Sequence, residues 1–298
     1  MKKLAFTKMH GIGNDYIYID TFKQNLSDLD VTPFVTRVSA RHFGIGADGV
    51  VFITPSARAD AKMEMYNADG SRGKMCGNAI RCVAKYLYDN NIKKCELLQI
   101  ETDAGIKKLK LFVDTQTDKV TDVEVDMGAP IFTPTDIPVD VSHLVTPLTT
   151  PEFILNHPLQ IKDENFYISC VSMGNPHCVI FSSEPVENLN LSDIGPLFEK
   201  NELFPEQINT EFVNILSPTH LHMRVWERGS GETLACGTGA CAIVACATRL
   251  GLIQKNTPIR VSLTGGDLII TYNEETTTLT MFGGCSVVFE GSITYETK

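Results

Sequence analysis

The feature that most constrains this 298-residue chain is an internal repeat. Cys76-Gly77 recurs as Cys236-Gly237, at an offset of 236 − 76 = 160 residues. Two further pairs of motifs recur in the same order at an offset of 161, since 174 − 13 and 266 − 105 both equal 161: Gly13-Asn14 with Gly174-Asn175, and Gly105 with Gly266. Three motifs in one order at nearly one spacing predict a duplicated fold with two similar halves.

The residues around each Cys-Gly pair predict the same local structure in both copies. Apolar and polar residues alternate from Ala61 to Tyr66 and from Leu221 to Trp226, which is typical of a half-buried strand. A Gly/Ser turn, the Cys-Gly pair and an apolar segment rich in small residues follow. We therefore expect helices over about residues 78–88 and 238–250, with mostly strands around each of them.

Residues 132–152 separate the two halves and resemble neither. They are rich in Pro and Thr. Such a composition predicts an extended connector with little core of its own.

The charge balance argues against two classes of partner. The chain has 26 Lys plus Arg against 36 Asp plus Glu, a net charge of −10 and a pI near 5.2. Nucleic acids and anionic membrane surfaces bind basic patches, so we expect neither, and a small molecule is the expected ligand.

The nine cysteines and the first residues of the chain predict a compartment. Nine is an odd number, and no apolar stretch near Met1 is long enough for a signal peptide because Lys8 interrupts it. The longest uncharged run, Leu234 to Thr248, is too short to span a bilayer and is expected to be a buried helix. Reduced thiols in a cytoplasmic protein are therefore expected.

The two repeated cysteines occupy positions that suit acid–base chemistry. Cys76 and Cys236 each come directly before a predicted helix, where unpaired N–H groups and the positive end of the helix dipole lower a thiol pKa. If the halves pack about a pseudo-twofold axis, the two thiols would share one proton, giving a base and an acid on opposite faces of a carbon. The alternative is two inert buried cysteines, which is also the expectation for Cys82, Cys241 and Cys246.

Metal and nucleotide sites have weaker support. No pair of C-x-x-C motifs exists, and Cys236, Cys241 and Cys246 step by five residues, which gives no shared helix face, so no metal is expected. Gly44 to Gly49 fits G-x-G-x-x-G, but the β-like run Val50 to Ile53 follows where a nucleotide-binding fold needs a helix. We expect a turn there.

Polar residues near the repeated motifs could hold an amino acid. Five asparagines lie beside Gly or Pro or at strand ends, where the alternative interpretation is local turn chemistry: Asn14, Asn67, Asn78, Asn175 and Asn209. Glu227-Arg228 lies between the second strand and Cys236, and His177 follows Asn175-Pro176. Together these groups suit the carboxylates and ammonium groups of an amino-acid substrate.

Four segments of the sequence closely resemble the diaminopimelate epimerase family, and the resemblance extends over essentially the whole chain from His10 to the C-terminal strands. They are Tyr66-Asn67-Ala68-Asp69-Gly70-Ser71, Met75-Cys76-Gly77-Asn78-Ala79-Ile80-Arg81-Cys82, Gly174-Asn175-Pro176-His177 and Glu227-Arg228-Gly229-Ser230-Gly231-Glu232-Thr233-Leu234-Ala235-Cys236-Gly237-Thr238-Gly239. The last of these is highly specific.

The resemblance implies an α+β fold of two pseudo-symmetric domains, each a mixed, barrel-like sheet around a central apolar helix. The implied halves are residues 1–128, to which 285–298 return, and 129–284. It also implies a homodimer and the interconversion of LL- and meso-diaminopimelate, in lysine and peptidoglycan precursor synthesis, without pyridoxal phosphate or another cofactor.

Roles for individual residues also follow from the resemblance. It implies that Cys76 and Cys236 exchange the proton, and that His177 and Glu227 tune them as further candidate catalytic residues. The remaining implied substrate-binding residues lie in two sets. Arg228, Asn67, Asn175 and Asn209 would hold the distal end of the substrate, and Asn14, Gly77, Asn78, Gly237 and Thr238 the reacting end. Some family members have a ligand-contacting glutamine where this chain has Gly49, so Gly49 is left out of the site.

Three other functions remain open at this point. A proline or hydroxyproline racemase of the same architecture would also pair two thiols, but Arg228 suits a substrate with a second carboxylate. A non-catalytic amino-acid-binding module would leave both cysteines inert. The absence of C-x-x-C disfavours a thiol–disulfide oxidoreductase.

Overall fold

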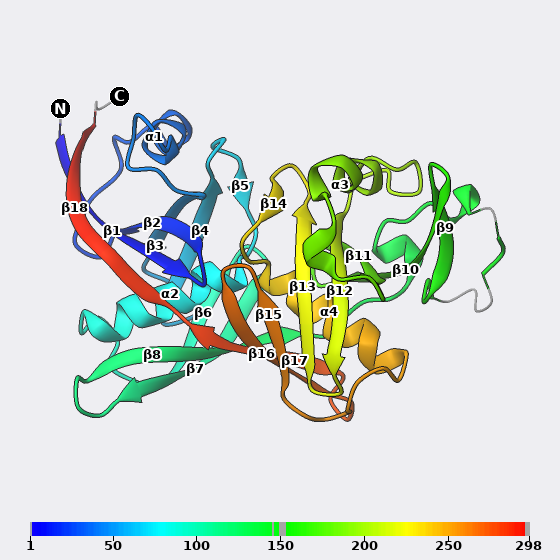
Figure 1. Ribbon diagram of the computed structural model, residues 1–298. Helices are drawn as coiled ribbons and strands as arrows, with labels where there is room; N and C mark the ends of the chain where they lie inside the picture. The colour runs from blue at the N-terminus through cyan, green and yellow to red at the C-terminus, as the bar shows by residue number, and fades with distance from the viewer. Residues whose placement is uncertain (1, 145, 149–152, 296–298) are drawn as a thin grey trace. The chain divides into compact units, whose positions relative to one another are not determined.

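The structure is a computed structural model that describes residues 2–144, 146–148 and 153–295 (Figure 1). Within it, strands pair in the same order twice along the chain. The chain divides into two units, Met1–Val125 with Phe282–Lys298, and Asp126–Met281. They are called unit 1 and unit 2 below.

The elements that begin in unit 1 are strands apart from two helices. They are β1 (Lys2–Gly11), β2 (Asn14–Asp20), α1 (Val31–Ser39), β3 (Gly49–Thr54), β4 (Ala61–Asn67), β5 (Arg72–Gly73), α2 (Gly77–Asp89), β6 (Leu97–Thr102), β7 (Gly105–Asp114), β8 (Lys119–Gly128) and β18 (Ser286–Tyr295). The pairing is antiparallel for β1 with β2, parallel for β2 with β3, antiparallel for β3 with β4 and parallel for β4 with β6.

The elements that begin in unit 2 include two α-helices and three short 3₁₀ helices. They are η1 (Pro134–Asp136), η2 (Val141–His143), β9 (His157–Ile161), β10 (Glu164–Ser172), β11 (Pro176–Phe181), η3 (Val186–Asn188), α3 (Leu191–Glu199), β12 (Asn209–Ser217), β13 (His220–Glu227), β14 (Gly231–Thr233), α4 (Gly237–Arg249), β15 (Ile259–Leu263), β16 (Gly266–Asn273) and β17 (Thr278–Gly284). The pairing is antiparallel for β10 with β11, parallel for β11 with β12, antiparallel for β12 with β13 and parallel for β13 with β15. This order matches that of unit 1, so the predicted duplication is confirmed.

The alternation that predicted a strand in each copy also determines which side chains are buried. In β4 the buried residues are Ala61, Met63 and Met65, and in β13 they are Leu221, Met223 and Val225. The residues between them are half-buried. Successive side chains of a strand point to opposite faces, so each strand turns one apolar face to a core.

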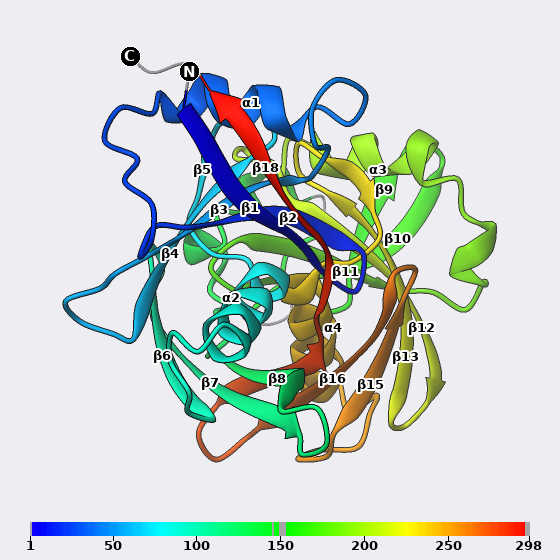
Figure 2. The same cartoon turned by 90° about the vertical axis from the view of Figure 1, so that its left-hand side faces the viewer.

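A single apolar helix packs inside each unit. The predicted helices correspond to α2 and α4, each within one residue at both ends. Helix α2 packs against β1, β2, β6 and β7 (Figure 2), and α4 against β10, β11, β12 and β16. Both helices consist largely of buried residues, which explains why α4 is built from Ala, Gly, Cys, Ile and Val.

The two ends of the described chain meet in one ladder of unit 1. Strand β18, red in Figure 1, pairs antiparallel with β1, from Lys2 opposite Tyr295 to His10 opposite Ser286. The C-terminal strand therefore completes the sheet that the N-terminal strand begins.

The prediction for residues 132–152 is wrong in one respect. Two 3₁₀ helices, η1 and η2, interrupt the segment, and Ile137 and Val139 belong to the hydrophobic core of unit 2. Phe132 is also buried, and it stacks edge-on against Phe153. These apolar residues stand singly among prolines and threonines and show no periodicity, so the sequence pattern did not predict that they belong to the core. Residues 145 and 149–152 lie outside the described part.

Gly49 begins β3 where no side chain fits. A Cβ at this position would lie 1.9 Å from the Tyr66 carbonyl oxygen and 2.9 Å from Tyr16 Cε1. The chain bends over residues 44–48, with a φ of +80° at Gly46, and the predicted strand begins at Gly49, one residue before the expected start. The close approach of two strands explains why glycine is required at position 49.

We expect Gly49→Ala to lower the free energy of unfolding by about 1–3 kcal/mol, because a methyl group here overlaps backbone atoms of the paired strand. Urea denaturation measures the change. Gly284→Ala is the matched control, since a Cβ there has its nearest neighbour at 3.6 Å. Equal stability of the two variants would contradict this explanation.

Candidate functional site

Each repeated cysteine is the N-cap residue of the helix inside its unit. Cys76 and Cys236 have extended backbones, with φ values of −136° and −119°. Their sulfur atoms accept hydrogen bonds of 3.4 Å from the backbone N–H groups of Ala79 and Gly239. As the sequence predicted, both thiols lie at the positive end of a helix dipole.

In unit 1 the Cys76 thiol contacts an asparagine that a carboxylate holds in place. The Sγ of Cys76 donates to Asn14 Oδ1 over 3.3 Å. Asn14 Nδ2 donates to Asp48 Oδ2 over 2.8 Å, and Arg41 forms an ion pair of 2.7 Å with Asp48. Asn14 is therefore a direct neighbour of the thiol, and Asp48 is a support that the sequence analysis missed.

The first turn of α2 is held by a buried arginine. The Arg81 guanidinium is fully buried and donates to Asn78 Oδ1 over 3.0 Å and to the Gly77 carbonyl oxygen over 3.3 Å. The Asn78 side chain thus serves the helix start. The N-terminus of a helix can bind an anion through its backbone N–H groups and its dipole.

In unit 2 the side chains of Thr238 and Asn175 connect the Cys236 thiol to His177. Thr238 Oγ1 lies 3.5 Å from Cys236 Sγ and accepts a hydrogen bond of 3.3 Å from Asn175 Nδ2. Asn175 Oδ1 lies 3.1 Å from His177 Nε2. The structure thus brings together four predicted site residues, Cys236, Thr238, Asn175 and His177.

The other face of His177 contacts a residue that sequence reasoning missed. Glu211, the third residue of β12, places its Oε1 2.6 Å from His177 Nδ1, and both side chains are fully buried. Its signal in the sequence was a carboxylate directly before the apolar pair Phe212-Val213. A charged residue within a buried strand needs a partner.

Burial and nearby charge raise the pKa of Cys236 well above its ordinary value. Removal from water is the largest cause, and the carboxylates of Glu227 and Glu211 add to it. Hydrogen bonds from Thr238 and from the Gly239 N–H oppose the shift. The expectation that the helix start lowers this thiol pKa is therefore wrong for Cys236, because desolvation and two carboxylates outweigh the helix terminus.

Glu227 lies at the end of β13 and is half-buried. Its Oε1 accepts a hydrogen bond from the Thr233 hydroxyl. Burial raises the pKa of Glu227, the Glu211 charge adds to the rise, and His177 opposes it. This carboxyl is thus a neighbour of Cys236 whose proton affinity is increased.

Asn209 and Arg228 form a second part of the predicted site in unit 2. Asn209 is buried, and its amide donates to the Pro176 carbonyl oxygen over 2.8 Å and accepts from the Arg228 N–H over 3.0 Å. The Arg228 side chain is exposed and donates to the Glu206 carbonyl oxygen over 2.9 Å. Asn209 therefore fixes the backbone from which the guanidinium of Arg228 extends.

Asn67 lies on an exposed turn at the end of β4. Its Nδ2 donates to Ser71 Oγ over 3.0 Å, and its backbone N–H donates to the Ser71 carbonyl oxygen over 2.8 Å. The Asn67 side chain therefore stabilises the turn. Gly237, at the start of α4, is buried beside Cys236 in sequence.

The predicted structural cysteines Cys82, Cys241 and Cys246 are all buried within the two central helices.

Among the described residues, no group of three or more His, Cys, Asp or Glu side chains is placed to hold a metal ion. None of the described helices combines the length and apolar character that crossing a membrane requires.

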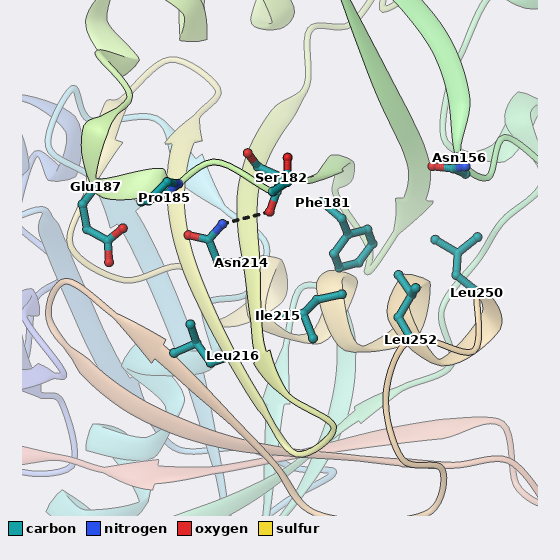
Figure 3. Close-up of a pocket in the computed structure, with 11 residues that line it drawn as sticks. Asn156, Phe181, Ser182, Pro185, Glu187, Asn214, Ile215, Leu216, Leu250 and Leu252 are labelled. Atoms are coloured by element: carbon teal, nitrogen blue, oxygen red, sulfur yellow. Dashed lines mark hydrogen bonds between the residues drawn. The ribbon is translucent and has the colours of Figure 1, made fainter.

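A cavity of about 690 Å³ in unit 2 contains none of the predicted site residues. Leu250 and Leu252 line it, beyond the last residue of α4, so it lies about one helix length, ~20 Å, from the end that Cys236 caps. Figure 3 shows Asn214 turned toward Ser182, whose carbonyl oxygen accepts from Asn214 Nδ2 over 2.9 Å. The Asn214 amide also bonds to Glu184 and Val186, so it stabilises the loop.

Comparison with known proteins points to one family. The family model described as diaminopimelate epimerase matches residues 6–133 and 169–288. A diaminopimelate epimerase from Acetivibrio thermocellus is 47% identical over 295 residues, which cover 97% of this chain and 98% of the relative. One from Methanococcus maripaludis is 46% identical over 291 residues, which cover 97% of this chain and 99% of the relative.

Solved structures of lower sequence identity share the fold. A probable proline racemase from Agrobacterium radiobacter has a TM-score of 0.69 at 13% identity, with 98% of this chain and 93% of the other covered. A phenazine biosynthesis protein of the PhzF family from Bacillus anthracis has a TM-score of 0.66 at 16% identity, with 99% and 100% covered. These similarities confirm the predicted α+β fold.

We expect Glu227→Gln to lower the pKa of Cys236, because it removes a negative charge that disfavours the thiolate. Iodoacetamide reacts with the thiolate, so the alkylation rate of Cys236 rises as the pH rises toward its thiol pKa. In the variant this rise shifts to lower pH, and alkylation at pH 8 becomes several-fold faster. Peptide mass spectrometry measures the rate at this cysteine.

The matched control for this prediction is Glu232→Gln, which removes an exposed carboxylate that pairs with Arg224 on the neighbouring strand. Its alkylation profile should equal that of the unmodified protein. A Glu227→Gln profile identical to that of the control would show that Glu227 does not act on the Cys236 thiol.

Proposed function

This chain belongs to the diaminopimelate epimerase family, and we propose that it interconverts LL- and meso-diaminopimelate with two thiols and no cofactor. The supporting observation is that each half of a duplicated fold presents one cysteine at the N-terminus of its central helix. Relatives that are 46–47% identical over 97% of the chain are diaminopimelate epimerases. This assigns the protein to lysine and peptidoglycan precursor synthesis.

Epimerisation requires that the α-hydrogen leaves one face of the carbon and a hydrogen arrives on the other. In the proposed reaction the thiolate of one cysteine takes the α-proton, so that a C–H bond breaks and an S–H bond forms. The electron pair delocalises into the substrate carboxylate. The thiol of the other cysteine then protonates the opposite face, and the roles of Cys76 and Cys236 reverse in the other direction.

Two helix starts suit the charge that develops in this reaction. Backbone N–H groups at the first turns, with the positive ends of the helix dipoles, stabilise a carboxylate and the additional charge of the deprotonated intermediate. We assign this role to Gly77, Asn78, Gly237 and Thr238, with Asn14 beside the Cys76 thiol. The hydrogen bond from Cys76 to Asn14 supports its place at the reacting end.

The other end of the substrate carries a second amino-acid group. We propose that Arg228 binds its carboxylate, with Asn67, Asn175 and Asn209 as the amide groups of the same region. The exposed guanidinium of Arg228 supports this role, since it extends from backbone that Asn209 fixes. His177 and Glu227 tune the Cys236 thiol, consistent with the raised pKa values of Cys236 and Glu227.

We also propose that the protein acts in the cytoplasm as a homodimer. Nine cysteines fit a reducing compartment, and the family resemblance implies the dimer. Sedimentation equilibrium of the purified chain measures the oligomeric state, and a monomer at micromolar concentration would exclude the dimer.

The function is tested by proton NMR of LL-diaminopimelate in D₂O with a thiol reductant and without pyridoxal phosphate. We expect the α-proton signal to disappear as the meso isomer forms. Cys76→Ala and Cys236→Ala should each slow this conversion by at least about 10²–10⁴-fold, because each removes one acid–base group. Cys95→Ala, which removes a half-buried cysteine that the mechanism does not use, is the control and should retain full activity.

Two other outcomes would overturn the proposal in different ways. Exchange on proline or another amino acid, with none on diaminopimelate, would retain the two-thiol mechanism and replace the substrate. No exchange on any amino acid would make the protein a binding module with inert cysteines.

A further inference from the structure

Within the described part of the chain, the carboxylate of Glu211 has one hydrogen-bonding partner, the imidazole of His177. The two side chains lie on the parallel strands β12 and β11, which neighbour one another in unit 2 (Figure 1). Among the described residues, Glu211 Oε2 is buried and has no hydrogen-bond partner, so His177 is the one group that compensates this carboxylate. A buried ion of this kind costs stability, which argues that it is not there for packing.

The strand pairing itself does not require this pair. His177 lies opposite Asn209 in β12, and Tyr16 lies opposite Gly49 in the matching strands of unit 1. Two residues further along, Glu211 in unit 2 therefore corresponds to Val51 in unit 1. Unit 1 builds the same pairing with apolar Val51 buried at that position.

Space for the carboxylate is provided by a glycine in the first turn of α4. A Cβ at Gly239 would lie 2.7 Å from Glu211 Oε1 and 3.3 Å from the Cβ of Cys236. The N–H of the same glycine donates to the Cys236 sulfur. Glu211 is thus packed against the turn that holds the thiol.

Both ring nitrogens of His177 face oxygen acceptors. Nδ1 lies 2.6 Å from Glu211 Oε1, and Nε2 lies 3.1 Å from Asn175 Oδ1. The same Asn175 amide donates from Nδ2 to Thr238 Oγ1 over 3.3 Å. An ionised carboxylate and an amide oxygen can only accept, so a hydrogen on each ring nitrogen, the imidazolium form of His177, would satisfy both contacts.

We infer that Glu211 is a positioning residue that holds His177 as an imidazolium, which in turn orients Asn175, Thr238 and the Cys236 thiol. The contacts form one continuous chain from Glu211 to Cys236 within unit 2. The imidazolium charge also opposes two carboxylates that act on this thiol, Glu211 on β12 and Glu227 at the end of β13. The role of these linked contacts in catalysis rests on the epimerase function proposed above.

The test compares Glu211→Gln with Thr210→Val in the substrate-free protein and in the epimerase assay. The glutamine keeps the size of the side chain but removes its charge. Thr210 is the adjacent residue of β12, fully buried, and its hydroxyl has no hydrogen-bond partner among the described residues. It is therefore a matched control for a buried substitution in this strand.

Nitrogen-15 NMR of His177 at pH 8 is the readout that a merely structural role would not change. The unmodified protein and Thr210→Val should show two similar, protonated ring nitrogens. Glu211→Gln should show the unequal nitrogens of a neutral ring, because the counter-charge is gone. Its kcat/KM for diaminopimelate should fall by about 10- to 100-fold, by analogy with the loss of the hydrogen-bond partner that orients a metal-binding histidine.

The results separate this inference from the proposed function. A neutral His177 in the unmodified protein, or a Glu211→Gln variant with unchanged kcat/KM, would overturn the inference even if the protein is an epimerase. If the unmodified protein does not epimerise diaminopimelate, the proposed function fails, and the nitrogen-15 spectrum still decides the state of the His177–Glu211 pair. That spectrum needs no variant, so it decides the pair even if Glu211→Gln does not fold.

Discussion

The hydrogen bond between a cysteine sulfur and the first turn of a helix is the interaction on which both halves of the candidate site depend. Helices usually begin at Ser, Thr, Asp or Asn, whose oxygen accepts an N–H of the first turn. Here Cys76 and Cys236 take that position, and each sulfur accepts from the N–H three residues later. The start of the helix and the location of the reactive atom are therefore the same structural feature, and the burial of α2 and α4 fixes both.

The two halves surround this shared feature with different chemistry. In unit 1 a half-buried network supports the thiol, since Asn14 contacts Cys76 and is held by Asp48, which pairs with the exposed Arg41. In unit 2 the support is buried and passes through Thr238, Asn175 and His177 to Glu211. Duplication preserved the backbone, while the polar groups behind each thiol diverged. Two thiols with unlike surroundings can have unlike proton affinities, which a one-base, one-acid reaction uses.

The local sequence pattern predicted the fold well. The features that it did not predict depend on contacts between residues far apart in the sequence. The alternation in β4 and β13 and the small residues of α4 are properties of neighbouring residues, so their strands and helix could be read directly. Ile137 and Val139 are single apolar anchors without a period, and Glu211 meets His177 only because β11 and β12 pair in parallel. The raised pKa of Cys236 likewise depends on burial and on carboxylates from two other strands. No sequence spacing encodes these distances.

The ladder between β1 and β18 constrains how the chain can fold. Unit 2 is one continuous segment, so all the strands that begin in it are available once residue 284 has been synthesised. Unit 1 needs β18, which comes last, to cover the edge of the strand that comes first. Until then the β1 edge exposes unpaired backbone groups, which other chains can pair with. Contacts between segments that lie far apart in the sequence also form slowly, because a long loop must close. We therefore expect unit 1 to be completed after unit 2 can fold, although most of unit 1 precedes unit 2 in the sequence.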